Sequence, residues 1–267
     1  MLDEYFQLAL NRIHVSFGSS IRRPVHIKRQ GRIFEIHVDK KIIYAPGMRR
    51  WRMYRNGIDM RLERVARRYG LHDLSPTERD EWVIDIGAYM GEWTLYMLRK
   101  GFNVLSIEPD PLAARCFERN MNLHAPADSK WLLDERVCFH EKRGSVTFYS
   151  EPVNADGSIF PSVKHASVPL TREAARLDTI IGDRIGEKRI CALKMDAEGA
   201  EPELLMGAQN LLAGELQIGI DAGAERLGES TVEECKNILI NAGFRLIENP
   251  SGDIVMAVSD REKEISS

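Results

Sequence analysis

Residues 83–92, Val-Ile-Asp-Ile-Gly-Ala-Tyr-Met-Gly-Glu, decide the fold of this chain. They join a continuous apolar run, Trp82 to Ile86, to a glycine-rich turn and then to a helical stretch from Glu92 to Lys100. An apolar run broken by a single carboxylate is typical of a strand buried on both faces of a parallel sheet. A strand, a tight turn and a helix in this order form the repeating unit of an open α/β sheet.

The same alternation continues to the end of the chain. Further strands are predicted at residues 103–107, 136–140, 145–149, 189–195, 215–221, 245–248 and 253–258. Helices are predicted at residues 111–123, 177–181, 204–212 and 232–239. The last two strands have no helix between them, so we expect a Rossmann-like sheet of about seven strands, mostly parallel, with an antiparallel last strand. Residues 151–170 show no period and are predicted to form a long loop, which in a compact domain is usually functional.

The composition is that of an ordinary globular protein. Of 267 residues, 43% are hydrophobic and 29% are charged, which excludes collagen-like and disordered chains. No stretch reaches the ~18 apolar residues that span a bilayer. Asp3 and Glu4 stand where a secretory signal carries basic residues, so we expect a cytoplasmic protein. The 4 cysteines form no CxxC pair, which indicates reduced packing residues and no metal site.

The charge is divided unevenly along the chain. Residues 1–80 carry 17 Lys and Arg against 9 Asp and Glu, a net charge of +8. Residues 81–267 carry 20 against 31, a net charge of −11. We therefore divide the chain into a basic α+β extension (1–80), a catalytic domain (81–260) and a polar tail (261–267). The extension, with a strand pair at 31–44 and a helix at 59–69, is expected to contact the substrate or another subunit, or to be a solvated or docked basic segment.

The glycine-rich turn is the strongest candidate for a ligand site. Ligands of parallel sheets bind beyond the carboxyl ends of the strands, and Gly87 and Gly91 would let a ligand approach the backbone closely. Glu108 ends the next strand 21 positions after Gly87, where doubly wound folds place a carboxylate against ribose hydroxyls. A plain structural turn between strand and helix is the alternative.

The ligand expected at this turn is not a dinucleotide. The turn lacks the three glycines that cradle a pyrophosphate, and the carboxylate of Asp85 just before it would repel one. Asp85 could instead receive the ammonium of an amino-acid group. A cofactor with a ribose, a cationic end and no phosphate fits these residues better than NAD, and S-adenosylmethionine is such a cofactor.

A second constellation, residues 193–201, follows a later strand and therefore faces the same edge of the sheet. Asp196 and Glu198 could cap the free N–H groups of the helix that follows, which explains part of the pattern. Helix capping does not explain Lys194, because a charge at the end of an apolar strand needs a partner or a function.

Together, VIDIGAYMGEWT (83–94), SIEPDP (106–111) and LKMDAEGAEPELLMGA (193–208) resemble the FkbM family of S-adenosylmethionine-dependent methyltransferases. The resemblance covers roughly residues 55–248. It assigns cofactor binding to Asp85, Gly87, Ala88, Tyr89 (in place of the usual Asn), Gly91, Glu108, Pro109 and, by a loose match near the adenine, Glu141. Its Lys-x-Asp-x-Glu-Gly-x-Glu signature falls on Lys194, Asp196, Glu198, Gly199 and Glu201. It implies a class I methyltransferase that acts on hydroxyl oxygens of sugars, polysaccharides or secondary metabolites.

Methyl transfer to a hydroxyl group benefits from a general base. The candidates are Asp196 and Glu198, with Lys194 orienting or pairing one of them, and His165 in the long loop as a second choice. The acceptor is expected to be a small molecule or glycan, anionic if the basic extension faces it. The sequence lacks the motifs of amine and cytosine methylation and those of a magnesium site. A degenerate fold that serves as a binding module and a nucleic-acid or protein methyltransferase stay open as alternatives, and an oligomer is possible.

Overall fold

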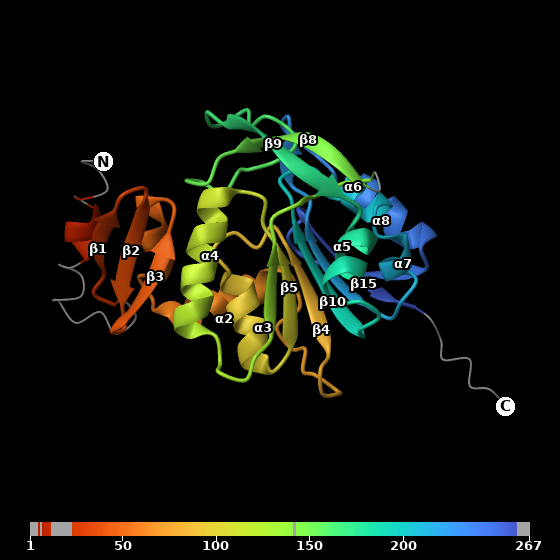
Figure 1. Ribbon diagram of the computed structural model, residues 1–267, viewed down its shortest axis with the longest axis horizontal. Coiled ribbons are helices and arrows are strands. Elements are labelled where there is room, and N and C mark those ends of the chain that lie inside the picture. The colour runs from red at the N-terminus through yellow and green to blue at the C-terminus, as the bar shows by residue number, and fades with distance from the viewer. Residues whose placement is uncertain (1–4, 6, 12–22, 141–142, 261–267) are drawn as a thin grey trace.

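The computed structural model describes residues 5, 7–11, 23–140 and 143–260. Its centre is a seven-stranded sheet with the order β14-β15-β11-β10-β4-β5-β6 (Figure 1). The parallel strands are β4 (Trp82–Ile86), β5 (Asn103–Ile107), β6 (Trp131–Asp134), β10 (Ile190–Asp196) and β11 (Gln217–Asp221). At one edge, β15 (Ile254–Ser259) runs antiparallel to both β11 and β14 (Phe244–Ile247). The predicted Rossmann-like sheet with an antiparallel last strand is confirmed.

Helices cover both faces of this sheet (Figure 1). On one face lie α2 (Ile58–Arg68), α3 (Glu92–Lys100) and α4 (Pro111–His124). On the other lie α5 (Leu177–Arg184), α6 (Glu201–Met206), α7 (Gln209–Leu212) and α8 (Val232–Asn241). Successive residues of β4 alternate between the two cores, with Val83 in the first and Ile84 in the second. This alternation explains why the strand is apolar throughout.

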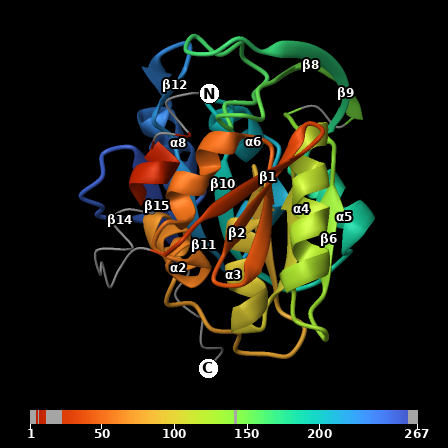
Figure 2. The same ribbon diagram turned by 90° about the vertical axis from the view of Figure 1, so that its left-hand side faces the viewer.

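A small antiparallel sheet precedes the central one. It consists of β1 (His26–Gln30), β2 (Ile33–Val38) and β3 (Lys41–Ala45), so the strand pair predicted at 31–44 is part of a three-stranded sheet. Figure 2 shows this sheet beside α4. The side chain of Asn120 in α4 bonds both the N–H and the C=O of Tyr44, at 2.8 and 2.9 Å, and so pairs backbone groups of β3.

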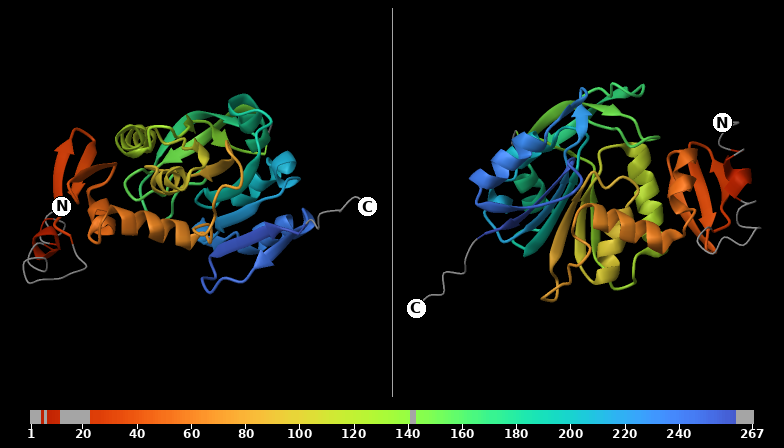
Figure 3. Two further views of the ribbon diagram at one scale, coloured as in Figure 1. Left: turned by 90° about the horizontal axis from the view of Figure 1, so that it is seen from below. Right: turned by 180° about the vertical axis from the view of Figure 1, so that it is seen from behind.

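From this sheet the chain passes through η1 (Met48–Tyr54) into α2, which confirms the helix predicted at 59–69. Figure 3 shows α2 lying along the central domain with its C-terminal end toward the central sheet. The basic extension is therefore in direct contact with the domain that follows it.

A second small sheet lies across the carboxyl edge of the central one (Figure 1). It contains β7 (Val137–Cys138), β8 (Arg143–Ser150) and β9 (Val168–Ala175). The strand predicted at 136–140 exists as β7, but it belongs to this second sheet, and β6 is the third strand of the central sheet along the chain. β6 is a short edge strand with three half-buried residues, so its hydrophobic signal is weak. The strand predicted at 145–149 exists, but it belongs to this second sheet.

The single helix predicted at 204–212 is divided into α6 and α7. The carboxylate of Asp178 in α5 accepts hydrogen bonds from the backbone N–H groups of Asn210 and Leu211, at 2.8 and 3.0 Å. It thereby caps α7 as a helix of its own, which the periodicity of the apolar residues could not reveal. No helix in the described part of the chain is both long and apolar enough to cross a membrane.

Candidate active site

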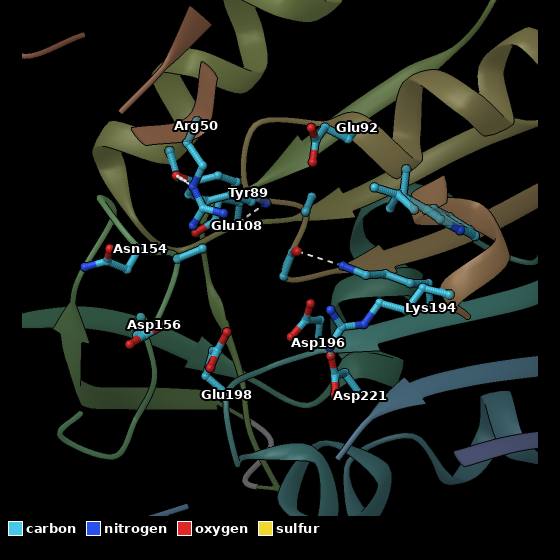
Figure 4. A pocket seen from close by; sticks show the side chains of 18 of the residues that line it. Arg50, Tyr89, Glu92, Glu108, Asn154, Asp156, Lys194, Asp196, Glu198 and Asp221 are labelled. Atoms are coloured by element: carbon cyan, nitrogen blue, oxygen red, sulfur yellow. Dashed lines mark hydrogen bonds and ion pairs between the residues drawn. The ribbon is translucent and has the colours of Figure 1, made fainter. Parts of the chain in front are cut away.

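A cavity of about 760 Å³ lies at the carboxyl ends of β4, β5, β10 and β11 (Figure 4). Residues of η1 and α2 form one wall, and the segment 151–157 forms another. The glycine-rich turn with Glu108 and the segment 193–201, both predicted from the sequence, meet here. They meet because each follows a parallel strand, and the carboxyl ends of parallel strands lie at the same edge of the sheet.

The glycine-rich turn supplies the floor of the cavity. Gly87 has a φ of +66°, and a Cβ there would lie 1.8 Å from the carbonyl oxygen of Asp196, so no other residue fits this conformation. The amides of Gly87 and Ala88 donate to the carbonyl of Ile107, at 3.0 and 3.1 Å. Gly87 and Ala88 line the cavity, whereas Gly91 lies behind the turn at the N-cap of α3.

Tyr89, the departure from the family pattern, ties three segments together. Its hydroxyl donates to the carbonyl of Pro152 at 2.7 Å and lies 3.1 Å from Nε of Arg50, which donates to it. The guanidinium carbon of Arg50 also lies 4.7 Å from the centre of the phenol ring. The phenol thus takes its polar contacts from η1 and the 151–157 segment.

Glu108 stands beside the turn at the end of β5. Its carboxylate accepts hydrogen bonds from the backbone N–H groups of Tyr89 and Asp110, at 2.7 and 2.8 Å. Burial, with the charge of Asp110 nearby, raises the pKa of Glu108 to about 8. Next to Glu108, Pro109 lines a small apolar cleft together with Ile107, Val137, Cys138, Phe148 and Ile159. A buried carboxylate and a small apolar cleft therefore lie side by side.

The structure corrects the roles expected for Asp85 and Lys194. Asp85 has no exposed surface and does not line the cavity. Its carboxylate accepts a hydrogen bond from Thr94 at 2.6 Å and forms an ion pair with Lys194, whose Nζ lies 3.0 Å away. Lys194 also donates to the carbonyls of Ile86 and Gly87, at 3.0 and 2.8 Å. Its ion pair is therefore with Asp85, and neither Asp196 nor Glu198 takes that place.

Four carboxylates converge on the opposite side of the cavity: Asp196, Glu198, Asp221 and Glu225 (Figure 4 labels the first three). Asp196 and Glu198 were predicted from the sequence, whereas Asp221 and Glu225 were not. Asp221 ends β11 directly beside Asp196, and Glu225 follows on the β12 (Ala224–Arg226) and β13 (Glu229–Ser230) hairpin. Asp221 could have been predicted in the same way as Asp196, because it also stands at the carboxyl end of a parallel strand.

Mutual repulsion and burial change how these groups ionise. The pKa of Glu198 rises to about 10, that of Glu225 to about 9 and that of Asp221 to about 6, mainly because burial disfavours their charged forms. Oxygens of Asp196, Glu198 and Glu225 lie within 4.8 Å of one another, close enough for the three to share a cation. The absence of a metal site stays a prediction from the sequence.

The backbone at Glu198 is shaped by Glu201. One oxygen of Glu201 accepts from the N–H groups of Ala197 and Gly199, both at 3.0 Å, and the other accepts from the hydroxyl of Thr231 at 2.9 Å. Glu198 itself has a φ of +52°, which is uncommon outside glycine. The three carboxylates of residues 194–201 therefore differ in role. Glu201 binds backbone groups of residues 197–199, whereas Asp196 and Glu198 face the cavity.

The basic extension contributes the wall that faces these carboxylates. Arg61 is bound by Glu92 through two hydrogen bonds, of 2.7 and 2.6 Å, and Arg68 pairs with Asp221. Arg64 of the extension and Lys164 of the 151–170 loop line the cavity as well, and no ion pair of either is found among the described residues. Part of the extension's charge is thus neutralised within the fold, and part of it faces the cavity.

The predicted catalytic residue His165 does not line the cavity. His165 pairs through Nδ1 with Asp156, which lines the cavity while His165 does not. Its contact with the site is therefore indirect. Glu141 lies outside the described residues.

Comparison with known proteins agrees with this geometry. Residues 85–246 match the Methyltransferase FkbM domain. A protein of Beauveria bassiana (strain ARSEF 2860), named Methyltransferase 1, is 31% identical over 155 residues, which are 51% of this chain and 61% of that protein. The chain thus spans about three fifths of the length of this relative.

Solved structures of methyltransferase folds are also similar. The fibrillarin pre-rRNA processing protein of Methanococcus jannaschii gives a TM-score of 0.44 at 15% identity, covering 88% of this chain and 96% of that one. The ribosomal protein L11 methylase of Lactobacillus delbrueckii subsp. bulgaricus gives 0.43 at 10% identity, covering 76% and 78%.

Proposed function

The chain belongs to the FkbM methyltransferase family, and on this premise we propose that it transfers a methyl group from S-adenosylmethionine to a hydroxyl oxygen of a sugar, polysaccharide or secondary metabolite. The observation that carries the proposal is one cavity with Glu108 beside a glycine turn at one end and Asp196 and Glu198 at the other. The first end suits a ribose, and the second suits a proton acceptor.

The residues present fit the cofactor by their chemistry. Glu108 offers a carboxylate to hydroxyl donors, Gly87 leaves the backbone bare, and the carboxylates across the cavity favour a cationic ligand. When bound, S-adenosylmethionine supplies a methyl group activated by its sulfonium. The protein therefore has to align an acceptor oxygen, remove its proton and keep water away.

Asp196 and Glu198 are the candidates for the proton acceptor. Because the pKa of Glu198 rises to about 10, Glu198 is protonated at neutral pH and serves as a hydrogen-bond donor to the acceptor. Asp196, at the end of β10, is then the better base. The wall formed by η1, α2 and the 151–157 segment limits the entry of water.

Two basic side chains that line the cavity support an expectation about the charge of the acceptor. Arg64 and Lys164 have no ion-pair partner among the described residues and border the cavity from two different segments. An acceptor that carries a carboxylate, sulfate or phosphate group would be attracted by both. We therefore favour a small molecule or glycan with negative charge.

Calorimetry with S-adenosylhomocysteine tests the cofactor site. Above pH 8, where Glu108 is ionised, Glu108→Ala should weaken binding by roughly 10- to 100-fold, because two ribose hydroxyls lose their charged acceptor. Glu118→Ala, at an exposed position of α4, is the matched control and should bind normally. Unchanged affinity in Glu108→Ala would remove this residue from the site.

Transfer of a radiolabelled methyl group to a fractionated cell extract tests the reaction. Label should appear in an acidic glycan or small-molecule fraction and should resist mild alkali, as an ether does and a methyl ester does not. Label confined to nucleic acid or protein would contradict the proposed acceptor class, and no label at all would contradict the proposed activity.

A further inference from the structure

Tyr69 is a residue of the basic extension that lines the active site. It is the C-cap of α2 and has 3% of its surface exposed, yet it lines the cavity. It precedes the segment 85–246 that matches the family domain, so family motifs do not identify it. A buried tyrosine at a polar cavity is expected to have a specific partner for its hydroxyl.

That partner is the candidate base. The hydroxyl of Tyr69 donates to Oδ2 of Asp196 at 2.6 Å, a short hydrogen bond to a carboxylate. Nζ of Lys194 lies 5.3 Å from the centre of the Tyr69 ring, so the ring also borders the Lys194–Asp85 ion pair. Burial and the carboxylate of Asp196 raise the pKa of Tyr69 well above its usual value, so the phenol keeps its proton and stays a donor.

The backbone also holds Tyr69 in place. Its carbonyl oxygen packs on Gly219 of β11, where a Cβ would lie 2.3 Å from that oxygen. The preceding residue, Arg68, forms an ion pair with Asp221. Since Asp196 and Asp221 are direct neighbours in the parallel pair β10–β11, the end of α2 engages both strand-end carboxylates.

We propose that Tyr69 is a positioning residue for methyl transfer, whose hydroxyl fixes Oδ2 of Asp196 so that the other carboxylate oxygen is presented to the acceptor hydroxyl. This inference rests on the proposed function, in which Asp196 is the base. A base that is oriented by a third group is a recurring arrangement in enzymes that activate hydroxyl groups. The proposed role of Tyr69 gives the contact between the extension and the catalytic domain a function, because the base Asp196 then depends on a residue of the extension.

The test is a double-mutant cycle on methyl transfer to the labelled acceptor fraction described above. Tyr69→Phe keeps the ring and should lower kcat by roughly 10- to 100-fold, the effect of one charge-assisted hydrogen bond, with KM changed by less than about twofold. Asp196→Asn should lower kcat at least as much. In the Asp196→Asn background, Tyr69→Phe should cause little further loss, because the two groups act as a unit.

Controls separate a positioning role from a structural one. Tyr96→Phe removes another hydroxyl, which donates to the carbonyl of His72 at 2.9 Å outside the cavity, and it should leave kcat unchanged. Both Tyr→Phe variants should bind S-adenosylhomocysteine as the wild type does. A crystal structure of Tyr69→Phe should show the Asp196 carboxylate turned from its position.

The outcomes distinguish the two proposals. Normal turnover in Tyr69→Phe, or losses that multiply in the double variant, would overturn the positioning role while leaving the methyltransferase proposal intact. Normal turnover in Asp196→Asn would overturn Asp196 as the base, and with it the role of Tyr69.

Discussion

Replacement of Lys194 by Met is the perturbation with the clearest calculated consequence. Lys194 and Asp85 are 4% and 0% exposed, and Nζ of Lys194 is also the donor for two carbonyls at the ends of β4 and its turn. Methionine fills a similar volume but leaves the carboxylate of Asp85 buried without its counter-charge. The substitution therefore keeps the packing volume and removes the counter-charge together with the two hydrogen bonds.

The magnitude follows from the burial of the pair. Removal of one partner from a buried ion pair costs about 3–5 kcal/mol. For a chain of this size, each kcal/mol lowers Tm by about 2–4 °C, so we expect a fall of about 6–20 °C. Asp85→Asn, added to Lys194→Met, removes the uncompensated charge and keeps an acceptor for Thr94, so it should restore part of the loss.

Thermal unfolding followed by circular dichroism measures this effect. Lys236→Met is the control, because Lys236 forms a surface pair with Glu233 and its loss should change Tm by less than about 2 °C. A Tm of Lys194→Met within about 2 °C of the wild type would refute the reasoning. A double variant with Asp85→Asn that is as unstable as Lys194→Met alone would refute it too, since the buried charge would not be the cause.

Three further predictions concern the cavity. Because burial raises the pKa of Glu108 to about 8 and ribose hydroxyls need its ionised form, affinity for S-adenosylhomocysteine should rise with pH and level off above 8, as calorimetry would show; a flat profile would contradict this. Folding raises the pKa of Glu225 to about 9, so the contribution of this group to stability is fully present below its unfolded pKa and is lost as the pH rises toward 9. Over this range the fall in Tm should be smaller in Glu225→Gln, and equal slopes would argue against it. Arg64→Gln should raise KM for an anionic acceptor several-fold and leave kcat nearly unchanged, whereas an unaltered KM would exclude Arg64 from acceptor binding.

The fold could be predicted where hydrophobic signals are local. The continuous apolar runs of β4 and β5 and the glycine turn between β4 and α3 are visible in the sequence, because each strand is buried on both faces. The edge strand β6 is half exposed, so its run was too weak to identify. The break between α6 and α7 depends on Asp178, which lies in another helix.

The site could be predicted only where its residues stand at the carboxyl ends of predicted strands. Gly87, Glu108 and Asp196 follow strands whose carboxyl ends meet at one edge, so their proximity could be inferred. The ion pair of Lys194 with Asp85 could not be predicted, because the choice of a lysine's carboxylate partner depends on how the strands pack. Tyr69 was missed for the same reason, since it reaches Asp196 only through the docking of α2.

The central claim is that one cavity binds the cofactor at Glu108 and presents a base at Asp196. A crystal structure of the protein with S-adenosylhomocysteine tests it most directly. We expect both ribose hydroxyls on the Glu108 carboxylate, the adenine in the apolar cleft beyond Pro109 and the sulfur directed toward Asp196. A ligand bound with its ribose away from Glu108, or with its sulfur directed away from Asp196, would contradict the account.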